Sequence, residues 1–154
     1  MLKWPNDLVM GDRKLAGLLT EVEMSGGRVD AVVLGVGCNC NWEVVPEELR
    51  GMATAVNLEA GRWVDRDEVL DRFLARLRER VAALEADPER SAREYAERLA
   101  TIGRRVEVEL PDRRLVGLAT AVDQLGRLVV TPPDGVPVTV SVGDVVHLRA
   151  ADHE

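Results

Sequence analysis

Two short polar stretches near the start of the chain combine residue types that could bind a charged substrate. The first is Lys3-Trp4-Pro5-Asn6-Asp7, and the second starts at Lys14 and runs into Ala16-Gly17. Proline fixes its own φ and biases the preceding residue towards extended geometry, so Asn6 and Asp7 should be presented from a rigid corner. Because Pro-Asn-Asp is also common turn chemistry, an ordinary turn is the alternative interpretation.

The distribution of lysine favours the chemical interpretation. The chain has 20 Lys plus Arg, and only Lys3 and Lys14 are lysines, which leaves 20 − 2 = 18 arginines. An ammonium differs from a guanidinium in being a compact point charge that suits a carboxylate or a phosphate. Chance placement of two rare residues is the alternative. Lys14 is the better candidate for chemistry, because a strand of small residues follows it.

A third candidate segment, Gly35-Val36-Gly37-Cys38-Asn39, ends an apolar run. Alternating glycines remove the side chains from one face of a strand, so a flat ligand could lie against the bare backbone. Gly17 offers the same opportunity on a second strand. A bulge or close packing between strands would explain these glycines equally well if each were taken alone.

Together the three motifs, in this order and spacing, resemble the second half of the catalytic domain of biotin protein ligases. The resemblance covers residues 2 to 58 by motif. It extends to residues 101 to 150 through the pattern of the family's small C-terminal β domain. Lipoate ligases share the wider fold, but the Lys-Trp-Pro-Asn-Asp corner favours biotin.

This resemblance implies an enzyme that activates biotin with ATP and passes it to a lysine of a carrier protein. The carboxylate of biotin would attack the α-phosphate of Mg-ATP to give biotinyl-adenylate, and the carrier lysine would then attack the activated carbonyl. Lys14 would be the catalytic residue, because its ammonium can neutralise charge on both the carboxylate and the phosphate. The residues expected to bind biotin and ATP are Asn6, Asp7, Lys14, Gly17, Gly35, Gly37 and Asn39.

The same resemblance suggests a magnesium–phosphate site and a partner. Asn6, Asp7 and Asn39 would help to hold Mg²⁺, which favours oxygen ligands. Lys3 and Trp4 would brace the corner. The expected partner is the biotin carboxyl carrier protein domain of a biotin-dependent carboxylase, with a homodimer left open.

Composition narrows the remaining classes. A net charge of −7 and a pI near 5.0 argue against broad binding to nucleic acid, which needs a basic face. The sequence contains neither a signal peptide pattern nor an apolar run of the ~18 residues that a membrane helix requires, so we expect a cytoplasmic protein. Cys38 and Cys40 should be reduced thiols rather than a metal site or a disulfide.

One family feature is missing from the sequence. The glycine- and arginine-rich loop that closes over biotin and the adenylate precedes the Lys-Trp-Pro-Asn-Asp motif in the family, and this chain lacks it. We therefore expect a ligase truncated at its N-terminus and inactive alone. The alternatives are a non-catalytic module that binds biotin or nucleotide, and a module that only interacts with the carrier.

Strands are expected to hold the three motifs. Leu2 to Trp4 predicts a strand that is already under way, and turn residues at Gly11-Asp12 and Ser25 to Arg28 predict two hairpins. Val29 to Gly37 is almost continuously apolar, which predicts a strand buried on both faces. Ala53 to Leu58 is expected to be structural only.

Two helices should follow. Asp65 with Glu68 predicts a capping box at the start of a long helix. A second capping box at Ser91, with a glutamate three residues later, predicts a shorter helix, and Asp87-Pro88 should separate the two. The apolar residues at helical spacing in the long helix form one stripe: Val69, Leu70, Phe73, Leu74, Leu77, Val81 and Leu84.

From Ile102 onward the apolar pattern changes to that of strands. The five expected strands are Val106 to Leu110, Leu115 to Val122, Leu128 to Thr131, Val136 to Val142 and Val145 to Leu148. Strands at this spacing predict a small SH3-like barrel, in which His147 is a surface or packing residue. The whole is an α+β fold: residues 1–100 form a mixed or antiparallel sheet with helices, an incomplete class II synthetase-like domain, and residues 101–154 form the SH3-like domain.

Overall fold

The computed structural model describes residues 1–111, 113–141 and 143–147. Its contacts divide the chain into two compact units. One unit consists of Asn6–Leu74, and the other joins Met1–Pro5 to the chain from Ala75 onward. This grouping places the two halves of the Lys3–Asp7 motif in different units. The division expected at residue 101 stays a prediction.

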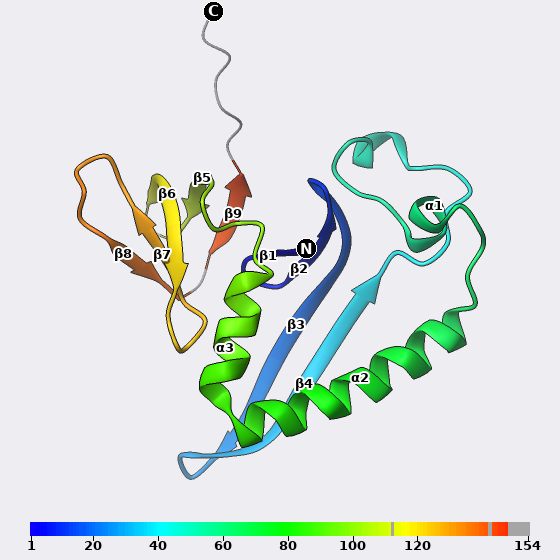
Figure 1. Cartoon of the computed structure of the whole chain (residues 1–154), viewed down its shortest axis with the longest axis horizontal. Helices are drawn as coiled ribbons and strands as arrows, with labels where there is room; N and C mark the ends of the chain where they lie inside the picture. Colours follow the sequence, from blue (N-terminus) through cyan, green and yellow to red (C-terminus); the bar gives the residue numbers. More distant parts are fainter. Residues whose placement is uncertain (112, 142, 148–154) are drawn as a thin grey trace, which may run out of the picture. The chain divides into compact units, whose positions relative to one another are not determined.

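An antiparallel sheet forms the centre of the first unit (Figure 1). Its strands β2 (Asp7–Met10), β3 (Arg13–Ser25) and β4 (Arg28–Cys38) follow one another in the sheet. The turn between β2 and β3 contains Gly11 at φ 61°, and the turn between β3 and β4 contains Gly26 and Gly27 at 57° and 81°. Glycine adopts these positive φ values without a steric cost, which explains both predicted hairpins.

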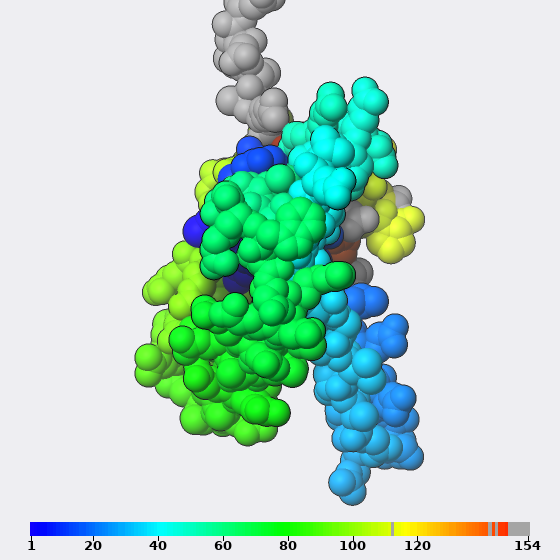
Figure 2. All heavy atoms as spheres, turned by 90° about the vertical axis from the view of Figure 1, so that its right-hand side faces the viewer, coloured from blue at the N-terminus to red at the C-terminus, as the bar shows by residue number. Residues whose placement is uncertain are grey.

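The prediction that β4 is buried on both faces is wrong. Val32 and Val33 point to opposite faces and are 59% and 51% exposed. On the face shown in Figure 2, spheres of the β3–β4 hairpin (blue) are visible at the surface. A continuous apolar run indicates that both faces favour burial, but it does not say which segment covers them. Among the described residues, no segment buries this strand.

Helix α2 (Arg66–Ala86) begins where Asp65 predicted it. The Asp65 carboxylate accepts hydrogen bonds from the backbone N–H groups of Asp67 at 2.8 Å and Glu68 at 3.4 Å. The Glu68 carboxylate pairs with Arg72 at 2.6 Å, and this contact takes the place of the expected return bond. Of the predicted apolar stripe, Val69, Phe73 and Leu77 are half-buried, and Leu70, Leu74, Val81 and Leu84 are exposed.

Helix α3 (Pro88–Glu97) starts three residues earlier than predicted. Asp87 caps it by accepting the N–H of Arg90 at 2.9 Å, and Pro88 occupies the first turn. The Asp87-Pro88 pair does separate the two helices, as predicted, since α2 ends at Ala86 and α3 starts at Pro88. Proline is preorganised for the first turn, so the helix begins at this pair and not at Ser91. Glu94, the expected partner in that signal, pairs with Arg80 and with Arg90.

The second unit contains a five-stranded antiparallel sheet in the order β8-β7-β6-β5-β9. Val106, Val108, Leu128 and Val130 are completely buried in its core. The five predicted strands are therefore present, although Val142 and Leu148 lie outside the described residues. An SH3-like closure of this sheet stays a prediction. The strands are β5 (Arg105–Glu109), β6 (Arg114–Val122), β7 (Leu128–Thr131), β8 (Val138–Val140) and β9 (Asp144–His147).

Trp4 belongs to the core of this second unit. It is 2% exposed, follows β1 (Leu2–Lys3), and its peptide bond to Pro5 is cis. Its backbone N–H donates to the Thr101 hydroxyl at 3.0 Å, and its indole N–H donates to the Gly126 carbonyl at 2.8 Å. The His147 ring also contacts the Thr101 hydroxyl, at 3.1 Å, so this histidine has a packing role. Trp4 is therefore anchored in this unit through its backbone and its ring, and the role expected for it in bracing the corner stays a prediction.

Candidate functional site

The candidate site begins with an ion pair on one face of the first sheet. Lys14 Nζ lies 2.6 Å from Asp7 Oδ1, and their side chains are 51% and 19% exposed. Asp7 is opposite Gly17 in the sheet, and Gly17 is opposite Gly37. A Cβ atom on Gly17 would lie 3.1 Å from Lys14 Nζ and 3.2 Å from Asp7 Oδ1. The missing side chain therefore gives the ammonium its place over the backbone.

The glycines of β4 extend the same bare face. A Cβ atom on Gly37 would meet its nearest neighbour, the Gly17 carbonyl oxygen, only at 4.0 Å. On Gly35 the nearest atom would be the Leu19 carbonyl oxygen at 3.6 Å. Neither position is crowded within the unit, so close packing between the strands does not explain these glycines. The face is open for a flat ligand beside Lys14.

Asn39 connects the segment around Thr54 to Lys14 through hydrogen bonds of its side chain. Its side-chain N–H group donates to the Thr54 carbonyl at 3.0 Å and to the Lys14 carbonyl at 3.5 Å. Lys14 and Thr54 are themselves joined, because the Thr54 N–H donates to the Lys14 carbonyl at 2.9 Å. The segment around Thr54, for which the sequence predicted only a structural role, is thus part of the site's frame.

Glu59 is a residue of this frame that the sequence did not reveal. Its carboxylate accepts the buried Thr54 hydroxyl and pairs with Arg13 at 2.9 Å. No motif connects these residues, since 46 positions separate Arg13 from Glu59. Only the fold brings them together.

Asn6 joins the corner to β3. Its side-chain N–H group donates to the Leu18 carbonyl at 2.6 Å, and its own carbonyl accepts the Leu18 N–H at 2.9 Å. Asn6 and Asn39 each donate a side-chain N–H to a backbone carbonyl, and each amide also carries an oxygen that can act as a ligand. Oxygen atoms of amides and carboxylates are of the type that magnesium binds, together with waters and substrate phosphates. Asp7 Oδ1 is already paired with Lys14 Nζ at 2.6 Å.

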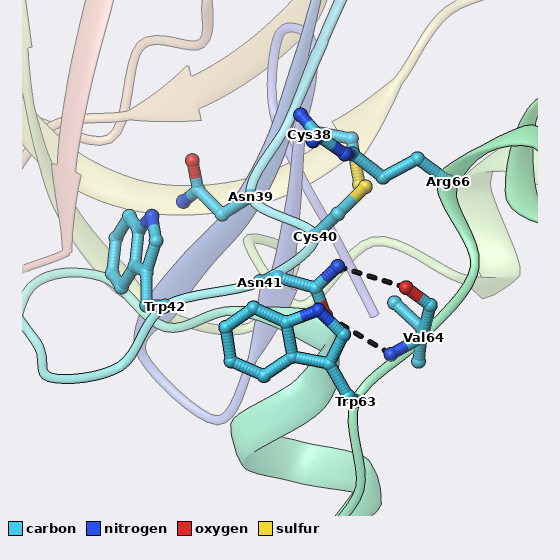
Figure 3. A pocket seen from close by; sticks show the side chains of 8 residues that line it. All are labelled: Cys38, Asn39, Cys40, Asn41, Trp42, Trp63, Val64 and Arg66. Atoms are coloured by element: carbon cyan, nitrogen blue, oxygen red, sulfur yellow. Dashed lines mark hydrogen bonds between the residues drawn. The ribbon is translucent and has the colours of Figure 1, made fainter.

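A cavity of about 380 Å³ lies beside Asn39 at the end of β4 (Figure 3). Asn41 joins two of its walls, since its side chain donates to the Val64 carbonyl at 2.8 Å and accepts the Val64 N–H at 3.0 Å. Asn57 holds Trp42 with the same double contact, at 2.8 and 3.0 Å. The cavity is lined by Cys38, Asn39, Cys40, Asn41, Trp42, Trp63, Val64 and Arg66.

Comparison with known proteins connects this geometry to one family. The model of the Biotin/lipoate A/B protein ligase family matches residues 1–39, and the model of the Biotin protein ligase C terminal domain matches residues 101–148. The chain belongs to the biotin protein ligase family. The first match contains the Lys14 ion pair and the glycine face, and the second contains the five-stranded sheet. The predicted family and α+β fold class are confirmed.

Several ligases of this family are similar over nearly the whole chain. The Biotin--[acetyl-CoA-carboxylase] ligase of Mycobacterium tuberculosis is 42% identical over 96% of this chain and 53% of that protein. The Bifunctional ligase/repressor BirA of Salmonella typhimurium is 32% identical over 98% of this chain and 47% of that protein. The chain therefore spans about half the length of these curated relatives.

Solved structures agree with the assignment. The biotin protein ligase from Aquifex aeolicus in complex with biotin and ATP is 25% identical, with a TM-score of 0.79 over 97% of this chain and 62% of that one.

Among the described residues of the present chain, no helix is long and apolar enough to cross a membrane.

Proposed function

We propose that this chain provides the Lys14 side of a biotin protein ligase site, which activates biotin with ATP and transfers it to a carrier-protein lysine. The observation that carries the proposal is the Lys14 ammonium, held by Asp7 over the bare backbone of Gly17 and Gly37. A cation beside an open, flat surface suits a planar ligand whose reacting group is anionic. The Aquifex aeolicus structure, which is a complex with biotin and ATP, supports the choice of substrates.

The reaction requires two displacements. In the first, a carboxylate oxygen of biotin bonds to the α-phosphorus of ATP as the bond to pyrophosphate breaks. In the second, the carrier's lysine amine attacks the carbonyl carbon, loses a proton, and AMP leaves. Both steps move negative charge between oxygen atoms, and a fixed ammonium stabilises that charge without having to reorganise.

Each predicted site residue has a separate role in this proposal. Lys14 contacts the carboxylate and phosphate oxygens, and Asp7 sets the position of its ammonium. Gly17, Gly35 and Gly37 let the ligand approach the backbone. Asn6 and Asn39 hold the corner and the Thr54 segment around the ligand. Magnesium, if held here by the oxygens of Asn6, Asp7 and Asn39, would neutralise phosphate charge.

The wider setting is also proposed. The acceptor is a biotin carboxyl carrier protein domain, and the five-stranded sheet is an SH3-like module. The reaction takes place in the cytoplasm, where carboxylases and reduced thiols such as Cys38 and Cys40 are found.

Substitution of Lys14 tests the proposal. In a preparation that shows biotin-dependent release of pyrophosphate, Lys14→Ala should lower the rate of adenylate formation about 100-fold, the effect of losing one preorganised charge contact. Lys14→Arg should recover only part of the rate, because a guanidinium has a different shape and hydration. Unchanged rates in both variants would remove Lys14 from the mechanism. Retained binding of biotin or nucleotide with no turnover in the unmodified protein would identify a non-catalytic module instead.

A further inference from the structure

The side chain of Lys14 lies on the bare face of the sheet because the pairing of β2 with β3 is irregular. Leu8 is opposite Ala16 in this pairing. The next pair is Val9 with Lys14, so Leu15 is an extra residue of β3. Successive side chains of a regular strand point to opposite faces, and one inserted residue reverses that order. Regular pairing would put Lys14 on the same face as Ala16, whereas the bulge turns it to the face formed by the glycines.

A segment distant in the sequence holds the backbone of the lysine at this bulge. Ala53 lies beside Lys14 in a parallel bridge. The Lys14 N–H donates to the Met52 carbonyl at 2.8 Å, and the Lys14 carbonyl accepts the Thr54 N–H at 2.9 Å. Both backbone polar groups of the lysine are therefore bound to this segment. The position of the segment decides where the bulge places the side chain.

One carboxylate oxygen connects this segment to the strand. Glu59 lies on α1 (Val56–Ala60), and its Oε1 atom accepts the hydroxyl of Thr54, which is completely buried. The same atom pairs with Arg13 at 2.9 Å, and Arg13 directly precedes Lys14. A charged acceptor makes both contacts stronger than a neutral one would. The contacts close a ring that runs from Lys14 through Arg13, Glu59 and Thr54 back to the Lys14 carbonyl.

The ring leaves the ligand face free. Arg13 is opposite Met10, the residue after the partner of Lys14, so the Arg13 and Lys14 side chains leave the strand on opposite faces. The Glu59 side chain, which is 22% exposed, pairs with the arginine. Glu59 can therefore hold the start of β3 without occupying the space of a ligand.

We propose that Glu59 is a positioning residue of the ligase site: by holding Arg13 and Thr54 it fixes the bulge that turns the Lys14 ammonium towards the substrates. The placement of the ammonium depends on these contacts alone, and its consequence for catalysis rests on the proposed function. A preorganised charge stabilises the transition state only where it is held in place. Glu59 acts on the reaction through Lys14.

NMR of the lysine ammonium groups in the whole 154-residue chain tests the placement without any need for turnover. The chain has only two lysines, so nitrogen-15 labelling of lysine gives one signal from Lys14 and a reference signal from Lys3. In Glu59→Ala and in Arg13→Ala the order parameter of the Lys14 ammonium should fall below about 0.6, the range of flexible groups, while that of Lys3 stays unchanged. Arg13→Ala leaves the buried Thr54 hydroxyl bonded, so it carries the test if Glu59→Ala does not fold.

Arg76 and Glu79 form the matched control pair. They are joined at 2.7 Å within α2, and their side chains are 79% and 61% exposed. Arg76→Ala and Glu79→Ala make the same changes of charge as the two test variants. Both lysine signals should stay as they are in the unmodified chain.

A kinetic cycle shows whether Glu59 acts through Lys14. In a preparation that shows biotin-dependent release of pyrophosphate, Glu59→Ala should lower the rate of adenylate formation about 10-fold, because a small displacement of a positioned group is costly. The same substitution added to Lys14→Ala should cause no further loss, since residues that act as one unit are not additive. A merely structural role would lower the rate in both backgrounds.

Two outcomes would overturn the positioning role. One is a Lys14 ammonium that stays ordered in both Glu59→Ala and Arg13→Ala, and the other is an equal loss of rate from Glu59→Ala with and without Lys14. An unchanged rate in Lys14→Ala itself would contradict the proposed function instead, and the NMR result alone then decides the placement.

Discussion

At the scale of single residues, the absence of a side chain at Gly17 is what gives Lys14 its position. The Gly17→Ala methyl group would stand 3.1 Å from both Lys14 Cε and Nζ. Because those atoms are the mobile end of a long side chain, the ammonium can move away and the fold should survive. The contact with Asp7 at 2.6 Å should not survive. We expect a rate of adenylate formation about 100-fold lower, with the unfolding midpoint nearly unchanged.

Gly37→Ala is the matched comparison for Gly17→Ala. Its methyl group would meet the nearest protein atom at 4.0 Å, so it should alter neither stability nor the Lys14–Asp7 pair. It should still weaken substrate binding, because it occupies the face on which the ligand is proposed to lie. Calorimetry with biotin and ATP separates the two effects. Undiminished binding in Gly37→Ala would show that the ligand lies elsewhere.

The sequence was informative about the identity of site residues and silent about their contacts. The rarity of lysine and the three motifs singled out Lys14, Gly17 and Asn39. The pairing of Lys14 with Asp7 depends on a register shift in β2 between Leu8 and Val9. A periodic pattern cannot specify such an irregularity.

At the scale of elements, the sequence offers two capping residues for α3, and the structure uses Asp87 and not Ser91. Asp87 accepts the Arg90 N–H at 2.9 Å, whereas Ser91 lies inside the helix. Asp87→Ala should therefore lower the free energy of unfolding by about 1 kcal/mol. Ser91→Ala should change it by only a few tenths, since alanine is favourable inside a helix. Urea denaturation followed by circular dichroism measures both, and equal effects would contradict this assignment of the cap.

Turns were easier to predict than burial. Glycine at positive φ defines the hairpins at Gly11 and at Gly26-Gly27, and these local constraints are legible in the sequence. The exposure of β4 is a different matter, because burial depends on which segments pack against the strand. Val32 and Val33 make the two faces of the strand apolar, one residue on each face, yet the described residues leave both side chains exposed. The apolar pattern indicates that burial of this strand is favourable, but it does not indicate which segments pack against it.

At the scale of the whole molecule, the Lys3–Asp7 motif spans the two compact units. Trp4 is anchored by Thr101 and Gly126, whereas Asp7 begins the sheet that carries Lys14. A motif of five consecutive residues thus contributes to both compact units. The chain also spans about half the length of its curated relatives, and the site face of β4 is open, with Gly35 and Gly37 both exposed.

This openness leads to a prediction for the isolated 154-residue chain. Water can reach the glycine face, so the chain gains little from orienting its substrates or from excluding solvent. We expect it to release pyrophosphate from biotin and ATP at least about 100-fold more slowly than a full-length ligase of the family. Val22 and Val32 are paired on the other face of the sheet and are 52% and 59% exposed, so self-association is a second cause of a low rate that the experiment must separate. The double variant Val22→Thr/Val32→Thr removes that ambiguity, because it makes the other face more polar without touching Lys14 or the glycines. If both proteins are slow and the variant sediments as a monomer, the low rate arises from the open site. Turnover equal to that of a full-length ligase would show that residues 1–154 form a sufficient site.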